Sequence, residues 1–180
     1  MPAVIKPFLL VALGAWAVLA GHAPVEALAE ELPREEAVRA VLVFNFLRFT
    51  EFPPGRVGNG REIMLCMHVR RPQQADALYQ LDGRRVGQRS LKVVDFPLSQ
   101  GACDVLYVDS QQRWHALADH PRLEKALTIS AYPGFAREGG MIEVDVDSEG
   151  TRFDINLRQG RRVGFHFSPE LLRLARRIHE

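Results

Sequence analysis

The sequence has 180 residues and a formal net charge of +1, because 23 basic side chains (Lys and Arg) nearly balance 22 acidic ones. This balance argues against a nucleic-acid partner, which would favour a strongly basic surface. The length suits one ordinary domain with its own core, and the two cysteines offer a single pair.

An apolar run, Phe8–Ala20, lies near the start of the chain. It is shorter than the ~20 residues that span a bilayer, and it is typical of the hydrophobic region of a secretory signal peptide. Small residues precede Glu30 at the two positions that a signal peptidase requires, so we expect residues 1–29 to be cleaved. Cleavage after Ala23 and an uncleaved membrane anchor are the alternatives. The exported part, residues 30–180, is expected to form one domain.

Both cysteines, Cys66 and Cys103, lie in the exported part. In an oxidising compartment an even pair predicts a disulfide. Such a bond would contribute roughly 4 kcal/mol in the chain-entropy account. Two separately buried thiols are the alternative, because the sequence does not show how closely the two Cα atoms approach.

Helices and strands are expected to alternate along most of the exported part. A helix from Pro33 to Phe52 is predicted by residues that recur at helical spacing, namely Val38, Val41, Leu42, Asn45, Phe46 and Phe49. Pro53 and Pro54 follow it and should end it. Apolar runs and capped segments then predict strands at 63–69, 91–96, 105–108 and 126–131, and helices at 72–81 and 111–118.

Strict alternation predicts a β-hairpin after these elements. Its first strand places apolar and acidic side chains on opposite faces, with Ile142, Val144 and Val146 against Glu143, Asp145 and Asp147. After a short turn, the second strand places three apolar side chains on one face: Phe153, Ile155 and Leu157. We expect antiparallel pairing, with one face buried and the other wet.

A last helix is expected from Pro169 to Ile178. Ser168 is a candidate N-cap, and apolar residues follow at helical spacing at Leu171, Leu174, Ala175 and Ile178. Together the elements predict an α/β fold: a single-domain sandwich with a mixed, mostly parallel sheet, a C-terminal antiparallel hairpin and flanking helices.

Residue types that carry catalysis or hold metals do not form a recognisable motif. No serine has the flanking glycines of a nucleophile elbow. No short-spaced metal pair is formed by any of the histidines of the exported part, which are His68, His115, His120, His166 and His179. Asp145, Asp147 and Glu149 are expected to keep the hairpin wet, with a metal site as the alternative. We therefore predict no enzyme activity, no metal and no cofactor.

The string GRRVG occurs twice, at 83–87 and at 160–164. It lacks the features of a phosphate-binding fingerprint, so two solvated turns are the simplest interpretation. The functional alternative is an arginine-lined anion site.

Six stretches, in this order along the chain, resemble the YfiR family. They are FNFLRFTEFP (44–53), LDGRRVGQRSLKV (81–93), CDVLYV (103–108), PGFAREGGMI (133–142), RFDINL (152–157) and LLRLARRI (171–178). Each motif is weakly specific alone, but the set covers nearly the whole exported part. The resemblance implies a non-enzymatic periplasmic regulatory protein with an α/β sandwich fold, often a homodimer.

The resemblance also implies a mechanism and partners. In the best-understood member type, the regulator binds the periplasmic domain of an inner-membrane diguanylate cyclase and represses it. An OmpA-like outer-membrane lipoprotein relieves the repression by sequestering the regulator, and the output is cyclic di-GMP and biofilm formation. The alternative is a periplasmic small-ligand binding module that feeds a histidine kinase or outer-membrane receptor, with its pocket at the carboxyl edge of the sheet.

Several residues take their roles from the resemblance. Cys66 and Cys103 match disulfide positions common in the family, while Phe52 stands where the opening motif usually has Trp. Phe135 and Ile142 occupy roughly the region of a second cysteine pair that some relatives carry. The structural residues of the family motifs are Asn45, Phe49, Gly139, Gly140, Phe153, Ile155, Asn156, Leu171, Leu172 and Leu174.

A glycine-rich loop carries the expected partner-binding residues. These are Phe135, Arg137, Glu138 and Met141, chosen because a contact surface combines exposed apolar side chains with a polar rim. The alternative is that Phe135 and Met141 fill the end of the hydrophobic core.

Overall fold

The computed structural model describes residues 25–54, 62–97, 101–117, 120–121 and 123–180, with side chains from residue 34 onward. Most of the predicted leader therefore lies outside the described residues. The first helix, α1 (Val25–Arg48), begins before the predicted cleavage position at Glu30. The start of this helix does not test cleavage, which stays a prediction. None of the described helices combines the length and the apolar character that crossing a bilayer requires.

Eight of the described strands form one sheet, in the order β10-β8-β7-β6-β5-β2-β4-β3. The pairs from β4 through β2, β5 and β6 to β7 are parallel, whereas β7–β8 and β3–β4 are antiparallel. This mixed, mostly parallel sheet confirms the predicted fold class. The strands are β2 (Glu62–His68), β3 (Arg85–Val86), β4 (Arg89–Asp95), β5 (Val105–Val108), β6 (Leu127–Ser130), β7 (Ile142–Asp147), β8 (Gly150–Asn156) and β10 (Arg177–His179).

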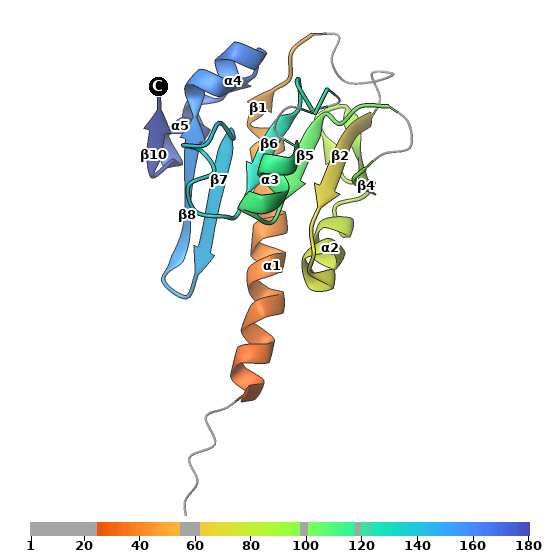
Figure 1. Cartoon of the computed structure of the whole chain (residues 1–180), viewed down its shortest axis with the longest axis vertical. Helices are drawn as coiled ribbons and strands as arrows, with labels where there is room; N and C mark the ends of the chain where they lie inside the picture. Colours follow the sequence, from red (N-terminus) through yellow and green to blue (C-terminus); the bar gives the residue numbers. More distant parts are fainter. Residues whose placement is uncertain (1–24, 55–61, 98–100, 118–119, 122) are drawn as a thin grey trace, which may run out of the picture.

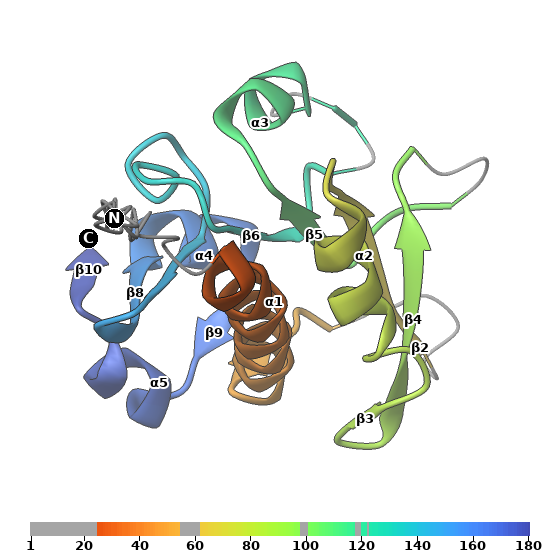
Figure 2. The same cartoon turned by 90° about the horizontal axis from the view of Figure 1, so that it is seen from below.

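Helices cover both faces of the parallel part of the sheet. Figure 2 shows α1 and α2 (Pro72–Tyr79) on one side and α3 (Gln111–Leu117) on the other. Successive side chains of β2 and β5 enter different core clusters, because a strand's side chains alternate between faces. The cluster under α1 contains Leu65 and Tyr107, and the cluster under α3 contains Cys66 and Leu106.

The predicted disulfide is present. Cys66 on β2 bonds to Cys103, which lies just before β5, and their Cα atoms are 5.7 Å apart. Both side chains are buried in the cluster under α3. The alternative of two separate thiols is therefore wrong.

The first helix ends earlier than the prediction. α1 stops at Arg48, and Thr50–Glu51 forms a short strand, β1, that pairs antiparallel with β9 (His166–Phe167). At the junction between α1 and β1, Thr50 Oγ1 donates a hydrogen bond of 2.7 Å to the Phe46 carbonyl in the last turn of the helix. Apolar spacing alone does not reveal this pairing with a strand more than a hundred residues away.

Two corrections concern the C-terminal part of the chain, the first at the last helix and the second at the end of the hairpin. The last helix, α5 (Pro169–Leu174), stops at Leu174, and the residues expected to continue it form β10, which pairs parallel with β8. The predicted N-cap is correct, because Ser168 Oγ accepts a hydrogen bond of 3.2 Å from the Leu171 amide.

Helix α4 (Leu157–Val163) replaces the expected end of the second hairpin strand and the arginine turn after it. Asn156 caps it by accepting a hydrogen bond of 2.9 Å from the Gln159 amide. The second GRRVG string therefore forms the end of a helix, while the first lies at the β3–β4 hairpin.

Candidate interaction surface

The expected partner-binding loop packs against α3. Phe135 is fully buried, with its ring centroid 4.9 Å from that of Trp114 and 5.3 Å from that of Tyr132. Met141 is 1% exposed and belongs to the cluster under α1. The expectation that these two side chains are exposed is wrong, and both instead fill the core.

The two charged residues of the loop differ in role. The Glu138 carboxylate accepts hydrogen bonds from Gln111 Nε2 (2.8 Å), His115 Nε2 (2.9 Å) and the Tyr132 hydroxyl (3.0 Å). These bonds, led by the one from His115, lower the pKa of Glu138. Both side chains are exposed, and Glu138 ties the loop to α3.

Two residues of the hairpin, Glu143 and Asn156, hold the other side of the loop. The Ala136 amide donates to Glu143 Oε2 at 3.1 Å, and the Ala136 carbonyl accepts from Asn156 Nδ2 at 2.8 Å. Asn156 was expected as a motif residue, and the structure shows it bonding both the loop and α4. The loop is thus fixed to α3 on one side and to the hairpin on the other.

The hairpin's polar face carries a network of ion pairs. Arg176 bonds Asp154 through two nitrogen atoms, at 2.8 and 3.2 Å, and reaches Asp145 at 3.2 Å. Arg152 pairs with Asp145, Asp147 and Glu149. The carboxylates proposed as an alternative metal site therefore surround a guanidinium group.

The expectation of a wholly wet polar face is wrong at two positions. Glu143 is 8% exposed and Asp154 is 3% exposed. Arg176 covers Asp154, and the loop around Ala136 covers Glu143. The described residues contain no group of three or more His, Cys, Asp or Glu side chains arranged to hold a metal ion.

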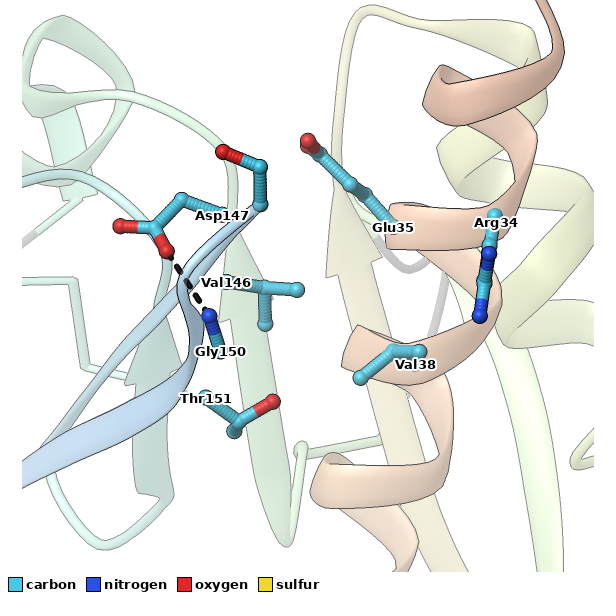
Figure 3. Close-up of a pocket in the computed structure, with 8 residues that line it drawn as sticks. Arg34, Glu35, Val38, Val146, Asp147, Gly150 and Thr151 are labelled. Atoms are coloured by element: carbon cyan, nitrogen blue, oxygen red, sulfur yellow. Dashed lines mark hydrogen bonds between the residues drawn. The ribbon is translucent and has the colours of Figure 1, made fainter.

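A cavity of about 300 Å³ separates α1 from the tip of the hairpin. Figure 3 shows Val38 and Val146 facing each other across it, while Glu35 points from α1 toward the hairpin. Asp147 turns aside to accept a hydrogen bond from the Gly150 amide at 3.1 Å. This cavity lies at the carboxyl end of β7, the kind of position where the small-ligand alternative expects a pocket.

A buried polar cluster anchors α1 beside this cavity. Glu36, 2% exposed, pairs with Arg39 at 2.9 Å and with Arg71 at 3.3 Å. The hydroxyl of Tyr107 accepts a hydrogen bond of 2.9 Å from Gln74, and burial raises the pKa of that hydroxyl. Arg39 also donates to the Val146 carbonyl at 3.1 Å, so the cluster joins α1, α2 and the sheet to the hairpin.

The histidines play separate parts. His115 pairs with Glu138, and the rings of His68 and His120 make edge contacts with Phe96 at 6.0 and 5.3 Å. His179 lies on β10, and β10 and β4 lie toward opposite ends of the sheet (Figure 2). The structure does not bring these side chains into one site.

Two of the five large apolar side chains that are exposed among the described residues lie in the last segment of the chain. Leu174 is 74% exposed at the end of α5, and Ile178 is 41% exposed on β10. Exposed Arg173 and Arg177 flank them. In the described part of the chain β10 pairs with β8 alone, so its outer edge carries unpaired backbone groups. Figure 1 shows β10 at the margin of the molecule.

The sequence also matches a known protein family. The sequence model of a family described as YfiR/HmsC-like matches residues 36–176, which covers the domain from the middle of α1 to the residue before β10.

Proposed function

The chain belongs to the YfiR/HmsC-like family, and from that premise we propose that it is a periplasmic regulator that binds and represses the outer domain of an inner-membrane diguanylate cyclase. The family match carries the proposal. The disulfide supports it, because disulfides persist in oxidising compartments such as the periplasm.

The contact surface that we propose is the α5–β10 edge, defined by Leu174, Ile178 and the flanking Arg173 and Arg177. It replaces the loop residues Phe135 and Met141, whose burial withdraws them from contact. An exposed apolar centre with a charged rim has the composition of a transient interface. Arg137 and Glu138 are the exposed residues of the original set. Glu138 is engaged with α3, so Arg137 stays a secondary candidate.

Repression would work by population shift. A regulator that binds the inactive conformation of the cyclase more tightly than the active one lowers the active fraction, and cyclic di-GMP falls. Release by an OmpA-like lipoprotein and a homodimeric state belong to the same proposal and rest on the family alone.

The test is a complementation experiment in a strain that lacks the regulator. The double variant Leu174→Ser/Ile178→Ser should restore high cyclic di-GMP and lose co-purification with the cyclase, while its thermal midpoint stays near that of the wild type. Val41→Ser is the matched control, because Val41 is an apolar side chain that is 50% exposed on another element, α1. Full repression by a folded double variant would refute this surface, and unchanged cyclic di-GMP on deleting the regulator would refute the function.

A further inference from the structure

A hollow of about 480 Å³ lies between the loop after β6, helix α4 and strand β10. Three of the side chains that line it are arginines: Arg137 from the loop, and Arg158 and Arg162 from α4. His179 lines it from β10, and none of the lining residues is acidic. All three arginines are exposed to solvent.

Most donors of the guanidinium groups around this hollow have no hydrogen-bond partner among the described residues. Arg162 uses Nε to bond Gln159 Oε1 at 3.0 Å, which orients the group and leaves both Nη atoms. Arg158 donates one bond, from Nη2 to the main-chain oxygen of Glu180. The carboxylate next to Arg137, that of Glu138, is engaged with α3 and Tyr132.

Charge alone makes this site attractive to anions. Three cationic groups around one concave surface produce a positive potential that concentrates counter-ions. The planar guanidinium group of arginine can donate two parallel hydrogen bonds to two oxygens of a carboxylate or phosphate. In addition, the buried Nε2 of His179 has no hydrogen-bond partner among the described residues.

We propose that this hollow binds a small organic anion through a carboxylate or phosphate group held by Arg137, Arg158 and Arg162. The volume of the hollow, about 480 Å³, lies within the ~300–1,000 Å³ range of small-molecule sites. Arg162 belongs to the second GRRVG string, which makes that string part of the anion site.

Isothermal titration calorimetry on the purified protein tests the proposal with three probes: inorganic phosphate, pyrophosphate and citrate. At least one should bind saturably. The double variant Arg158→Gln/Arg162→Gln and the single variant Arg137→Gln, which alters the opposite wall, should each weaken binding at least tenfold. Pyrophosphate and citrate distinguish a phosphate ligand from a carboxylate ligand.

Arg161→Gln is the matched control, because Arg161 is an exposed arginine of the same helix that does not line the hollow. It should retain wild-type affinity. Circular dichroism melts confirm that each variant is folded. The proposal is overturned if none of the three probes binds saturably, or if Arg161→Gln weakens binding as much as the hollow variants do. These results do not depend on the cyclase.

Discussion

Two groups of arginines lie on the polar face of the β7–β8 hairpin and beyond its open end, and their surroundings differ. On the polar face, Arg152 near the turn and Arg176 beside the Glu143–Asp154 pair stand among five carboxylates: Glu143, Asp145, Asp147, Glu149 and Asp154. Beyond the open end, the described residues that line the hollow with Arg137, Arg158 and Arg162 include no acidic side chain. Figure 1 shows the hairpin turn and α4 far apart along β8. The same residue type therefore stabilises the fold on the polar face and is available for binding beyond the open end.

The difference follows from what each arginine must neutralise. Asp154 is 3% exposed, and a buried carboxylate needs a paired cation because the lost hydration is costly. Arg176 supplies it, and the pairing raises the pKa of Arg176. In the hollow no buried carboxylate requires the guanidinium groups, so their removal should leave the fold intact.

The largest predicted effect comes from Arg176→Met. This change leaves the buried Asp154 carboxylate unpaired, and we expect a loss of about 3 kcal/mol in the free energy of unfolding. Urea unfolding measures it. Arg162→Met, the matched change at the hollow, should alter the free energy by less than about 0.5 kcal/mol, as usual for surface substitutions.

A double variant sharpens this result. Asp154→Asn/Arg176→Met removes both charges, so it should be more stable than Arg176→Met alone. Equal losses for Arg176→Met and Arg162→Met would erase the distinction between the two groups of arginines.

The second prediction concerns the loop that carries Arg137. A Cβ at Gly140 would lie 2.3 Å from Cε1 of the buried Phe135 ring, so Gly140→Ala should cost about 1–3 kcal/mol through overpacking. Thermal or urea unfolding measures the loss. Gly140 does not have a positive φ, unlike Gly139 (φ 91°), so the cost is steric.

Phe135→Leu supplies the control for this mechanism. If the clash causes the loss, Gly140→Ala should cost less in a Phe135→Leu background than in the wild type. Additive costs would contradict it. The two predicted motif glycines therefore have different roles. Gly139 permits a positive φ, and Gly140 leaves room for the Phe135 ring.

The local sequence pattern predicted those elements whose conformation does not depend on contacts with distant residues. Val105–Val108 matches β5 to the residue, because a continuous apolar run fits a strand buried on both faces. The hairpin followed equally from alternation.

The predicted ends of elements were wrong where contacts with distant residues decide the backbone conformation. Helical spacing continued through Ile178, yet Ala175 is extended (ψ 136°), and the Arg176 amide donates to the Phe153 carbonyl at 2.8 Å. At Leu157 a signal existed, since Asn156 is a good N-cap residue, but the alternation of β8 concealed it.

The candidate site was less predictable than the fold. A glycine-rich loop carries no periodicity, so the sequence could not show that Phe135 enters the core or that Glu138 bonds α3. The hollow draws its arginines from α4 and from a loop more than fifteen residues earlier, and this meeting depends on the tertiary fold.

A smaller effect is expected at Glu138, which holds the loop that carries Arg137. Its folded pKa lies below the ordinary value of 4.5, so its stabilising effect is present above that pH and is lost as the pH falls through the folded value. Glu138→Gln should therefore have a lower thermal midpoint at neutral pH and a flatter decline from pH 5 to about 3. Glu51→Gln, at the exposed position of β1, is the control and should keep the wild-type decline.

The smallest predicted effect is at Arg152, which is 39% exposed. Because solvent screens its ion pairs, Arg152→Gln should cost only about 0.5–1 kcal/mol at low salt. At about 1 M salt the Debye length falls to about 3 Å and the loss should shrink toward zero. At the hollow the sign should reverse: Arg162→Gln removes repulsion between like charges, so at low salt it should leave stability unchanged or slightly raised. Urea unfolding of both variants at two salt concentrations gives this comparison directly. Losses of the same sign and the same salt dependence in both groups would mean that the hollow is neutralised in the folded protein after all.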